Sequence, residues 1–94
     1  MVKYMCFCMM APDFLMLSLE ERRNFVPEWT ELAADYGLRL LFWGPTMGIK
    51  EHVVFVFESN RNSINFFKFQ REWQSLGTPD AGKYIQYIRT ITVH

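Results

Sequence analysis

Residues Val2 to Ala11 (VKYMCFCMMA) are apolar on both faces of the β-strand that they are expected to form. Successive side chains of a strand point to opposite faces of a sheet. One face therefore carries Val2, Tyr4, Cys6, Cys8 and Met10, and the other carries Met5, Phe7 and Met9. The helices of a small α+β domain cover only one face of its sheet. We therefore expect a second copy of the chain to cover the other face.

The composition indicates a single domain over residues 1–94. This length provides one modest hydrophobic core, and the 50% hydrophobic and 17% aromatic content excludes a disordered chain. Ten basic and ten acidic residues cancel, so we expect neither nucleic acid nor a membrane as a partner. Pro12 and Asp13 interrupt the apolar N-terminus, which argues against a signal peptide. A cytoplasmic protein is the simplest expectation.

The two cysteines are expected to be buried thiols. On a strand, the Cα atoms of Cys6 and Cys8 lie about 6.5–7 Å apart, at the edge of disulfide reach. With His52 and His94 they could form a metal site, but structural zinc sites place such cysteines on turns. Free cysteine usually behaves as a small buried hydrophobe. We therefore expect no metal and no cofactor.

A first helix is expected between Ser18 and Tyr36. Ser18 and Glu21 have the spacing of a capping box, and Gly37 is placed to end the helix. An apolar stripe recurs every three or four residues and consists of Phe25, Trp29, Leu32 and Tyr36. Pro27 lies inside this pattern and predicts a kink or a short break, because proline removes a backbone hydrogen bond.

The rest of the chain reads as two strands, a helix and a strand. The expected elements are strands Leu38–Trp43 and Glu51–Glu58, a helix from Ser59 or Asn60 to Leu76, a loop Gly77–Lys83 and a strand Tyr84–Val93. A turn at Gly44-Pro45 should end the second strand. The helix has a core stripe of Phe66, Phe69, Trp73 and Leu76, while Ile64 and Phe67 fall beside it and either flank the core or form a contact surface.

This βαββαβ order predicts a ferredoxin-like α+β fold. Its sheet would have four antiparallel strands in the order 4-1-3-2, with both helices on one face. The stretch from Trp29 to Trp73 resembles the dimeric α/β-barrel superfamily: LAADYG, LRLLFWGP, TMGIKEH, VVFVFES and FFKFQREW follow in that family's order. Within this superfamily, the stretch is most similar in element order and residue character to small GYD-like and YciI-like proteins. The resemblance implies a homodimer with facing sheets. Neither expected helix contains a histidine, so the resemblance implies no haem site.

Four residues form the candidate site. His52 could act as a general base, or it could be a hairpin histidine that is hydrogen-bonded or solvated. Tyr4, Trp43 and Phe55 could wall an apolar ligand cavity with it, or they could belong to the core and the dimer seam. Arg39 and Arg89, within expected strands, are either members of ion pairs at an interface or solvent-facing side chains.

The sequence supports three hypotheses for function. The first is a homodimeric α/β-barrel protein of unassigned activity that binds a small apolar ligand or none. The second is a cofactor-independent enzyme, such as a monooxygenase or isomerase. The third is an RNA-binding module, because RRM domains share this element order and HVVFVFES resembles the aromatic half of their third-strand motif. The Lys/Arg-Gly pair that opens this third-strand motif is missing, and Lys50-Glu51-His52 stands in its place. We therefore expect weak or absent RNA binding.

Overall fold

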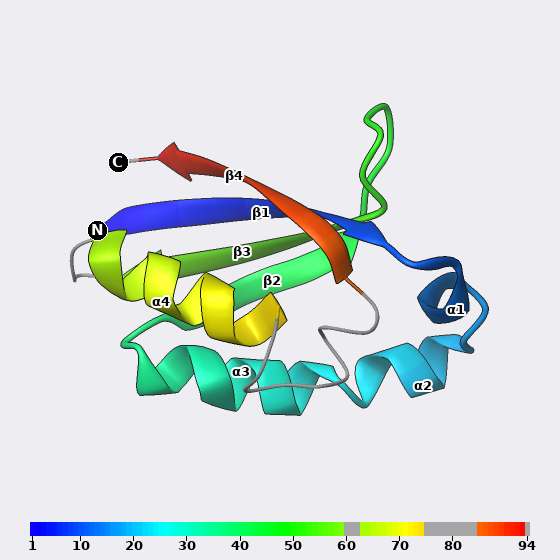
Figure 1. Cartoon of the computed structure of the whole chain (residues 1–94), viewed down its shortest axis with the longest axis horizontal. Helices are drawn as coiled ribbons and strands as arrows, with labels where there is room; N and C mark the ends of the chain where they lie inside the picture. Colours follow the sequence, from blue (N-terminus) through cyan, green and yellow to red (C-terminus); the bar gives the residue numbers. More distant parts are fainter. Residues whose placement is uncertain (60–62, 75–84, 94) are drawn as a thin grey trace.

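Four antiparallel strands form one sheet in the order β2-β3-β1-β4, and helices cover one of its faces (Figure 1). The structure, a computed structural model, describes residues 1–59, 63–74 and 85–93. Its elements are β1 (Val2–Met10), α1 (Pro12–Leu15), α2 (Leu19–Arg23), α3 (Val26–Asp35), β2 (Arg39–Pro45), β3 (Val53–Ser59), α4 (Ser63–Gln74) and β4 (Ile85–Val93). The ferredoxin-like fold and the strand order 4-1-3-2 are thereby confirmed. The predicted loop Gly77–Lys83, together with Asn60, Leu76 and Tyr84, lies outside the described residues.

The first helical region is divided into three helices. The Ser18 hydroxyl accepts a hydrogen bond from the Glu21 N–H, and the Ser18 N–H donates to the Glu21 carboxylate, both at 3.1 Å. This confirms the capping box. The predicted break at Pro27 is also confirmed: α2 ends at Arg23, and proline occupies the first turn of α3, where its missing N–H costs nothing. Helix α1 was not predicted.

The second strand is longer than predicted. Gly44 and Pro45 do not form a turn but continue β2, where they pair with Val54 and Val53. Proline is tolerated here because β2 is an edge strand, whose outward N–H groups need no partner in the sheet. The turn therefore spans residues 46–52, with Gly48 at a φ of 81°. The predicted helix cap at Ser59 is also wrong, since Ser59 is the last residue of β3.

Aromatic rings fill the core between the sheet and the helices. Phe55 lies at its centre, with ring centroids of Trp29, Trp43, Phe57 and Trp73 between 5.3 and 6.5 Å away. The helix-facing side of β1 contributes Tyr4, Cys6, Cys8 and Met10, and α4 contributes Phe66, Phe69 and Trp73, as predicted from its stripe. None of the described helices is long and apolar enough to cross a membrane.

Candidate functional site: the open face of the sheet

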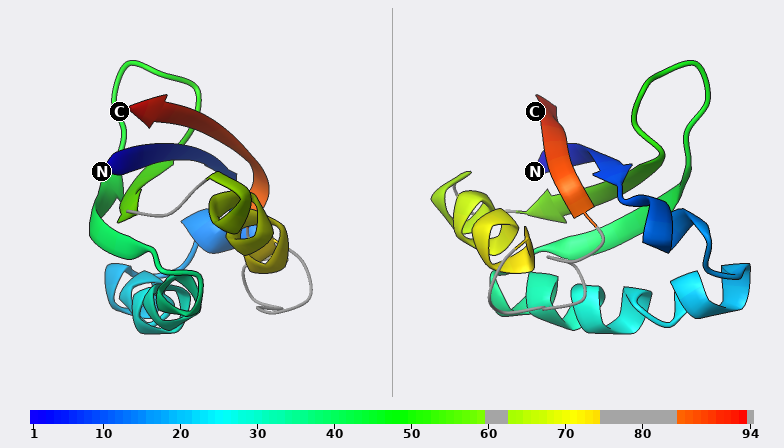
Figure 2. Two further views of the ribbon diagram at one scale, coloured as in Figure 1. Left: turned by 90° about the vertical axis from the view of Figure 1, so that its left-hand side faces the viewer. Right: turned by 45° about the vertical axis from the view of Figure 1, so that its right-hand side comes forward.

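None of the described helices lies over one face of the sheet, and we call this face the open face (Figure 2). Its side chains follow from the strand pairing, because they alternate with the residues of the core. The open face consists of Arg39, Phe42 and Gly44 from β2; Val54, Val56 and Glu58 from β3; Lys3, Met5, Phe7 and Met9 from β1; and Tyr87, Arg89, Ile91 and Val93 from β4. The prediction that β1 is apolar on both sides therefore places three large side chains here.

An uninterrupted apolar row crosses all four strands of this face. Phe42, Val56, Met5 and Ile91 are consecutive cross-strand partners. The two outer members are the most exposed, with 57% of Phe42 and 43% of Ile91 accessible to solvent. Phe7, Met9 and Val54 on the neighbouring rows are half-buried. Val56, inside the row, is only 3% exposed, so the accessible apolar surface comes mainly from Phe42 and Ile91, with Met5 half-buried between them. Exposed apolar side chains gathered on one face of a domain are typical of an interaction site.

A buried carboxylate lies at the hairpin end of the open face. Glu51 is only 5% exposed, and its two oxygens accept hydrogen bonds from Arg89 Nε at 3.1 Å and Nη2 at 2.9 Å. The Tyr87 hydroxyl donates a further bond of 3.3 Å. The Arg89 guanidinium also lies over the Phe7 ring, 4.9 Å from its centroid. Hydrogen bonding to Arg89 lowers the pKa of Glu51 to about 2. Arg89 thus forms an ion pair within its own subunit while half of its side chain stays exposed; that the pair lies at an interface stays a prediction.

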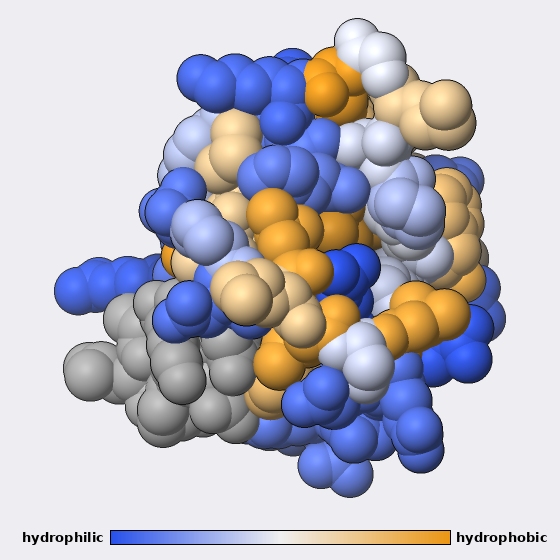
Figure 3. Space-filling model, turned by 90° about the vertical axis from the view of Figure 1, so that its right-hand side faces the viewer, coloured by the Kyte–Doolittle hydropathy of each residue, from blue (hydrophilic) through white to orange (hydrophobic). Residues whose placement is uncertain are grey.

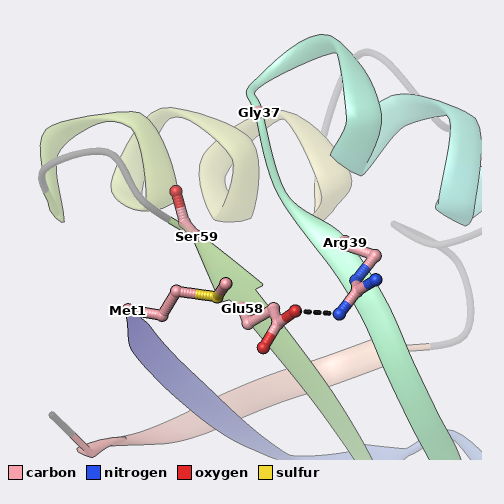
Figure 4. Close-up of a pocket in the computed structure, with 5 residues that line it drawn as sticks. All are labelled: Met1, Gly37, Arg39, Glu58 and Ser59. Carbon is pink, nitrogen blue, oxygen red and sulfur yellow. Dashed lines mark hydrogen bonds and ion pairs between the residues drawn. The ribbon is translucent and has the colours of Figure 1, made fainter.

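The opposite end of the open face is charged. Arg39, Glu58 and Lys3 form a cross-strand row there, and Arg39 is ion-paired with Glu58. A cavity of about 280 Å³ opens beside this pair and is lined by Met1, Gly37, Arg39, Glu58 and Ser59 (Figure 4). Polar and apolar groups both line this cavity, and none of the predicted site residues is among them.

The four predicted site residues are not gathered around one cavity. Tyr4 is buried and stacks on Phe66, with ring centroids 4.1 Å apart. Trp43 stacks on Phe55 at 5.9 Å, so these two do meet, but as packed rings of the core. Both pairs lie on the helix side of the sheet. The assignment of these residues to a ligand site stays a prediction.

His52 lies apart from those rings, at the base of the hairpin. The backbone N–H of His52 donates to the Cys8 carbonyl at 3.0 Å. The Nδ1 atom of its ring accepts a hydrogen bond of 3.1 Å from the backbone N–H of Met10. An accepting Nδ1 carries no proton, so the ring proton is on Nε2. These contacts match the interpretation of a hydrogen-bonded hairpin histidine. They supply a structural role that does not depend on catalysis.

Cys6 and Cys8 are fully buried, as predicted. Burial raises the pKa of Cys6 to about 12, although the hydroxyl of Thr90 at 3.8 Å opposes the shift. Burial also raises the pKa of Cys8 well above its ordinary value. Both side chains face the helices, where the Thr90 hydroxyl also lies 3.1 Å from the side-chain oxygen of Gln70 of α4 and donates its one hydrogen to either of these two neighbours. That they bind no metal stays a prediction.

Phe55 and Phe57 bear on the RNA-binding hypothesis. The aromatic residues of an RRM stack on bases from the sheet face that has no helices. Here the aromatic residues of HVVFVFES point toward the helices, and both are buried. The open face at β3 instead carries Val54 and Val56. The stacking platform that the motif would require is therefore missing from β3.

Sequence reasoning did not identify Glu51 as a site residue. The available signal was a pair of opposite charges, Glu51 and Arg89, each next to an otherwise apolar strand segment. Their contact spans β1 and depends on the register of two non-adjacent strands, which the sequence does not give.

Comparisons with known proteins support the fold. No family model matches the chain, and no curated protein matches its sequence. Among solved structures it is similar to an uncharacterized NIPSNAP domain protein from Burkholderia xenovorans, with a TM-score of 0.64 and 17% sequence identity. The match covers 100% of this chain and 93% of the other. The fold is thus similar to that of this NIPSNAP domain protein. The finer likeness to GYD-like and YciI-like proteins stays a prediction.

Proposed function

We propose that this protein functions as a homodimer whose two sheets pack against each other through their open faces. The observation that carries the proposal is the apolar row of Phe42, Val56, Met5 and Ile91, which crosses the whole sheet. The similarity in fold supports the proposed dimer, because the sequence resembles the dimeric α/β-barrel superfamily, which is named for the pairing of two sheets. The overall charge of zero adds no repulsion between copies.

The distribution of charge on the open face favours this packing. The charged row of Lys3, Arg39 and Glu58 lies at one end of the face, and the Glu51–Arg89 pair lies at the other. The apolar row lies between them. In a symmetric interface the same patch of each copy meets its counterpart, so a central apolar band with polar margins is self-complementary.

The test compares two isoleucine variants by sedimentation over a range of concentrations. Ile91→Asp places a carboxylate in the apolar row and should shift the protein to monomer, because an unpaired buried charge is costly. Ile64→Asp is the matched control: Ile64 is 59% exposed on α4, away from the open face, and the variant should stay dimeric. The proposal would be overturned if Ile91→Asp and Met5→Asp, measured separately, both had the same dimer dissociation constant as the wild type.

The small apolar ligand and the cofactor-independent enzyme are the alternatives from the sequence. Rings already occupy the surroundings of Tyr4 and Phe55, so no described cavity favours either one. The activity is therefore left unassigned, and assembly is the function that the structure supports.

A further inference from the structure

The hairpin of residues 46–52, which we call the arm, rises from the sheet on the side of the open face. In Figures 1 and 2 it projects away from the helices, beyond β1 and β4. Its tip contains two apolar side chains, Met47 and Ile49, which are 95% and 44% exposed. Figure 3 shows hydrophobic residues, in orange and tan, near the top of the molecule. Met47 is thus almost fully accessible, and Ile49 leaves nearly half of its surface open to a partner.

The base of the arm is firmly attached. The Thr46 N–H donates to the His52 carbonyl at 3.1 Å, and the Thr46 hydroxyl donates to the Glu51 carbonyl. The Glu51 side chain reaches across β1 to Arg89 and Tyr87 on β4. A buried carboxylate is expensive unless it is paired in this way. These contacts fix the direction in which the arm projects, so binding through its tip requires little ordering.

Contacts at the rim of the open face would add to the interface. The sheet has four strands, and β1 pairs with β3 over Val2–Cys8, so the face measures roughly 450 Å² in projection at standard strand dimensions. A stable interface usually buries about 800 Å² of accessible surface on each partner, a quantity that also follows the relief of the side chains. The arm projects at the rim and has apolar side chains at its tip, so it is placed to enlarge the buried area.

We propose that the arm clasps the second copy of the chain, with Met47 and Ile49 packing on the partner. This inference rests on the proposed dimer. The occupant is a second copy because the arm is continuous with the open face at its base and projects from the same side. Gly44, on β2 beside the arm, has open space above it: a Cβ built there would meet nothing within 4 Å. Partner atoms can therefore approach this edge closely.

The experiment measures the dimer dissociation constant of a double variant, Met47→Asp with Ile49→Asp. We expect dissociation to become easier by about tenfold or more, since apolar contacts at a desolvated interface carry much of the affinity. Thermal unfolding at a concentration where both proteins are monomeric should be unchanged, because both positions are exposed in the subunit. Ile64→Asp with Phe67→Asp, on exposed sites of α4, is the matched control and should leave dissociation unchanged.

The outcomes separate the arm from the dimer. If Ile91→Asp dissociates the dimer but the arm variant has the wild-type dissociation constant, the arm proposal is overturned and the proposed function stands. If the wild-type protein is monomeric at every concentration, both are overturned. If the arm and α4 variants weaken the dimer equally, the arm has no specific role and the inference is likewise overturned.

Discussion

The imidazole of His52 extends the pairing of β1 beyond the point where its neighbour β3 begins. The last residues paired in that ladder are Cys8 and Val53. Beyond them the chain diverges into the arm, and the Met10 N–H would lack a partner from β3. The His52 Nδ1 accepts that hydrogen bond instead. A histidine that sequence reasoning treats as a catalytic candidate thus has a sufficient structural explanation.

Substitution of His52 should therefore affect stability. His52→Ala leaves the Met10 N–H without this acceptor in a buried setting, and the free energy of unfolding should fall by about 1–3 kcal/mol. His52→Asn can place its side-chain oxygen near the position of Nδ1 and should restore part of the loss. Urea denaturation of the three proteins measures both effects. Equal stability of the alanine variant and the wild type would contradict the structural role.

The two cysteines should be unreactive in the folded protein. The thiolate is the reactive form, and burial raises the pKa of both thiols far above neutrality. A thiol reagent at pH 7.5 should label neither Cys6 nor Cys8 until denaturant is added, after which both should react. Rapid labelling of either one under native conditions would show that the sheet opens or that the thiol is accessible.

The arm is the element whose position depends most on a single ionised side chain. Its attachment to β4 is made by Glu51, whose pKa lies at about 2, below the ordinary value of 4.5. A carboxyl with a lowered pKa in the folded state stabilises that state while it is ionised. The stabilisation is complete above about pH 4.5 and is lost as the pH falls toward 2.

The acid dependence of unfolding should show this contribution. Between pH 5 and pH 2, the melting temperature of the wild type should fall more steeply than that of Glu51→Gln, which lacks the titrating carboxyl. Glu31→Gln, an exposed site on α3, is the control and should follow the wild type. Parallel curves for the wild type and Glu51→Gln would mean that the ion pair contributes nothing to stability.

At the scale of elements, local patterns were predictable and pairings between elements were not. Strand alternation in residues 2–11 and the helical stripe of Phe66, Phe69 and Trp73 assigned these side chains to faces correctly, because each pattern depends on neighbours in sequence. The extension of β2 through Pro45 was missed, since only its position at the sheet edge makes proline acceptable. The Glu51–Arg89 contact was missed because it depends on register across three strands.

In the candidate site, too, local patterns could be predicted from the sequence, whereas contacts between elements could not. Tyr4, Trp43 and Phe55 were correctly recognised as possible core residues, but their grouping with His52 required a shared face. Val53 faces the core and His52 precedes it, so alternation alone moves the imidazole away from the aromatic cluster. The open face was predictable from β1 alone, because Met5, Phe7 and Met9 left an apolar side without a helix to cover it.

For the whole molecule, Gly44 allows the interface to be altered without changing the subunit. A side chain at this position would enter open space, and the φ of Gly44 is not positive, so Gly44→Leu should fold normally. In the dimer the leucine would occupy space that the partner needs, and overpacking of this kind is destabilising. We expect the dissociation constant to rise while the unfolding of the monomer is unchanged. An unaltered constant, measured by sedimentation, would place the interface away from β2.

The mass of the wild-type protein in solution, measured by light scattering from micromolar concentration upward, tests the central claim most directly. One chain has a mass of 11.2 kDa, and we predict the mass of two chains together with a return to one chain in Ile91→Asp. The mass of a single chain for the wild type across that range would contradict assembly through the open face.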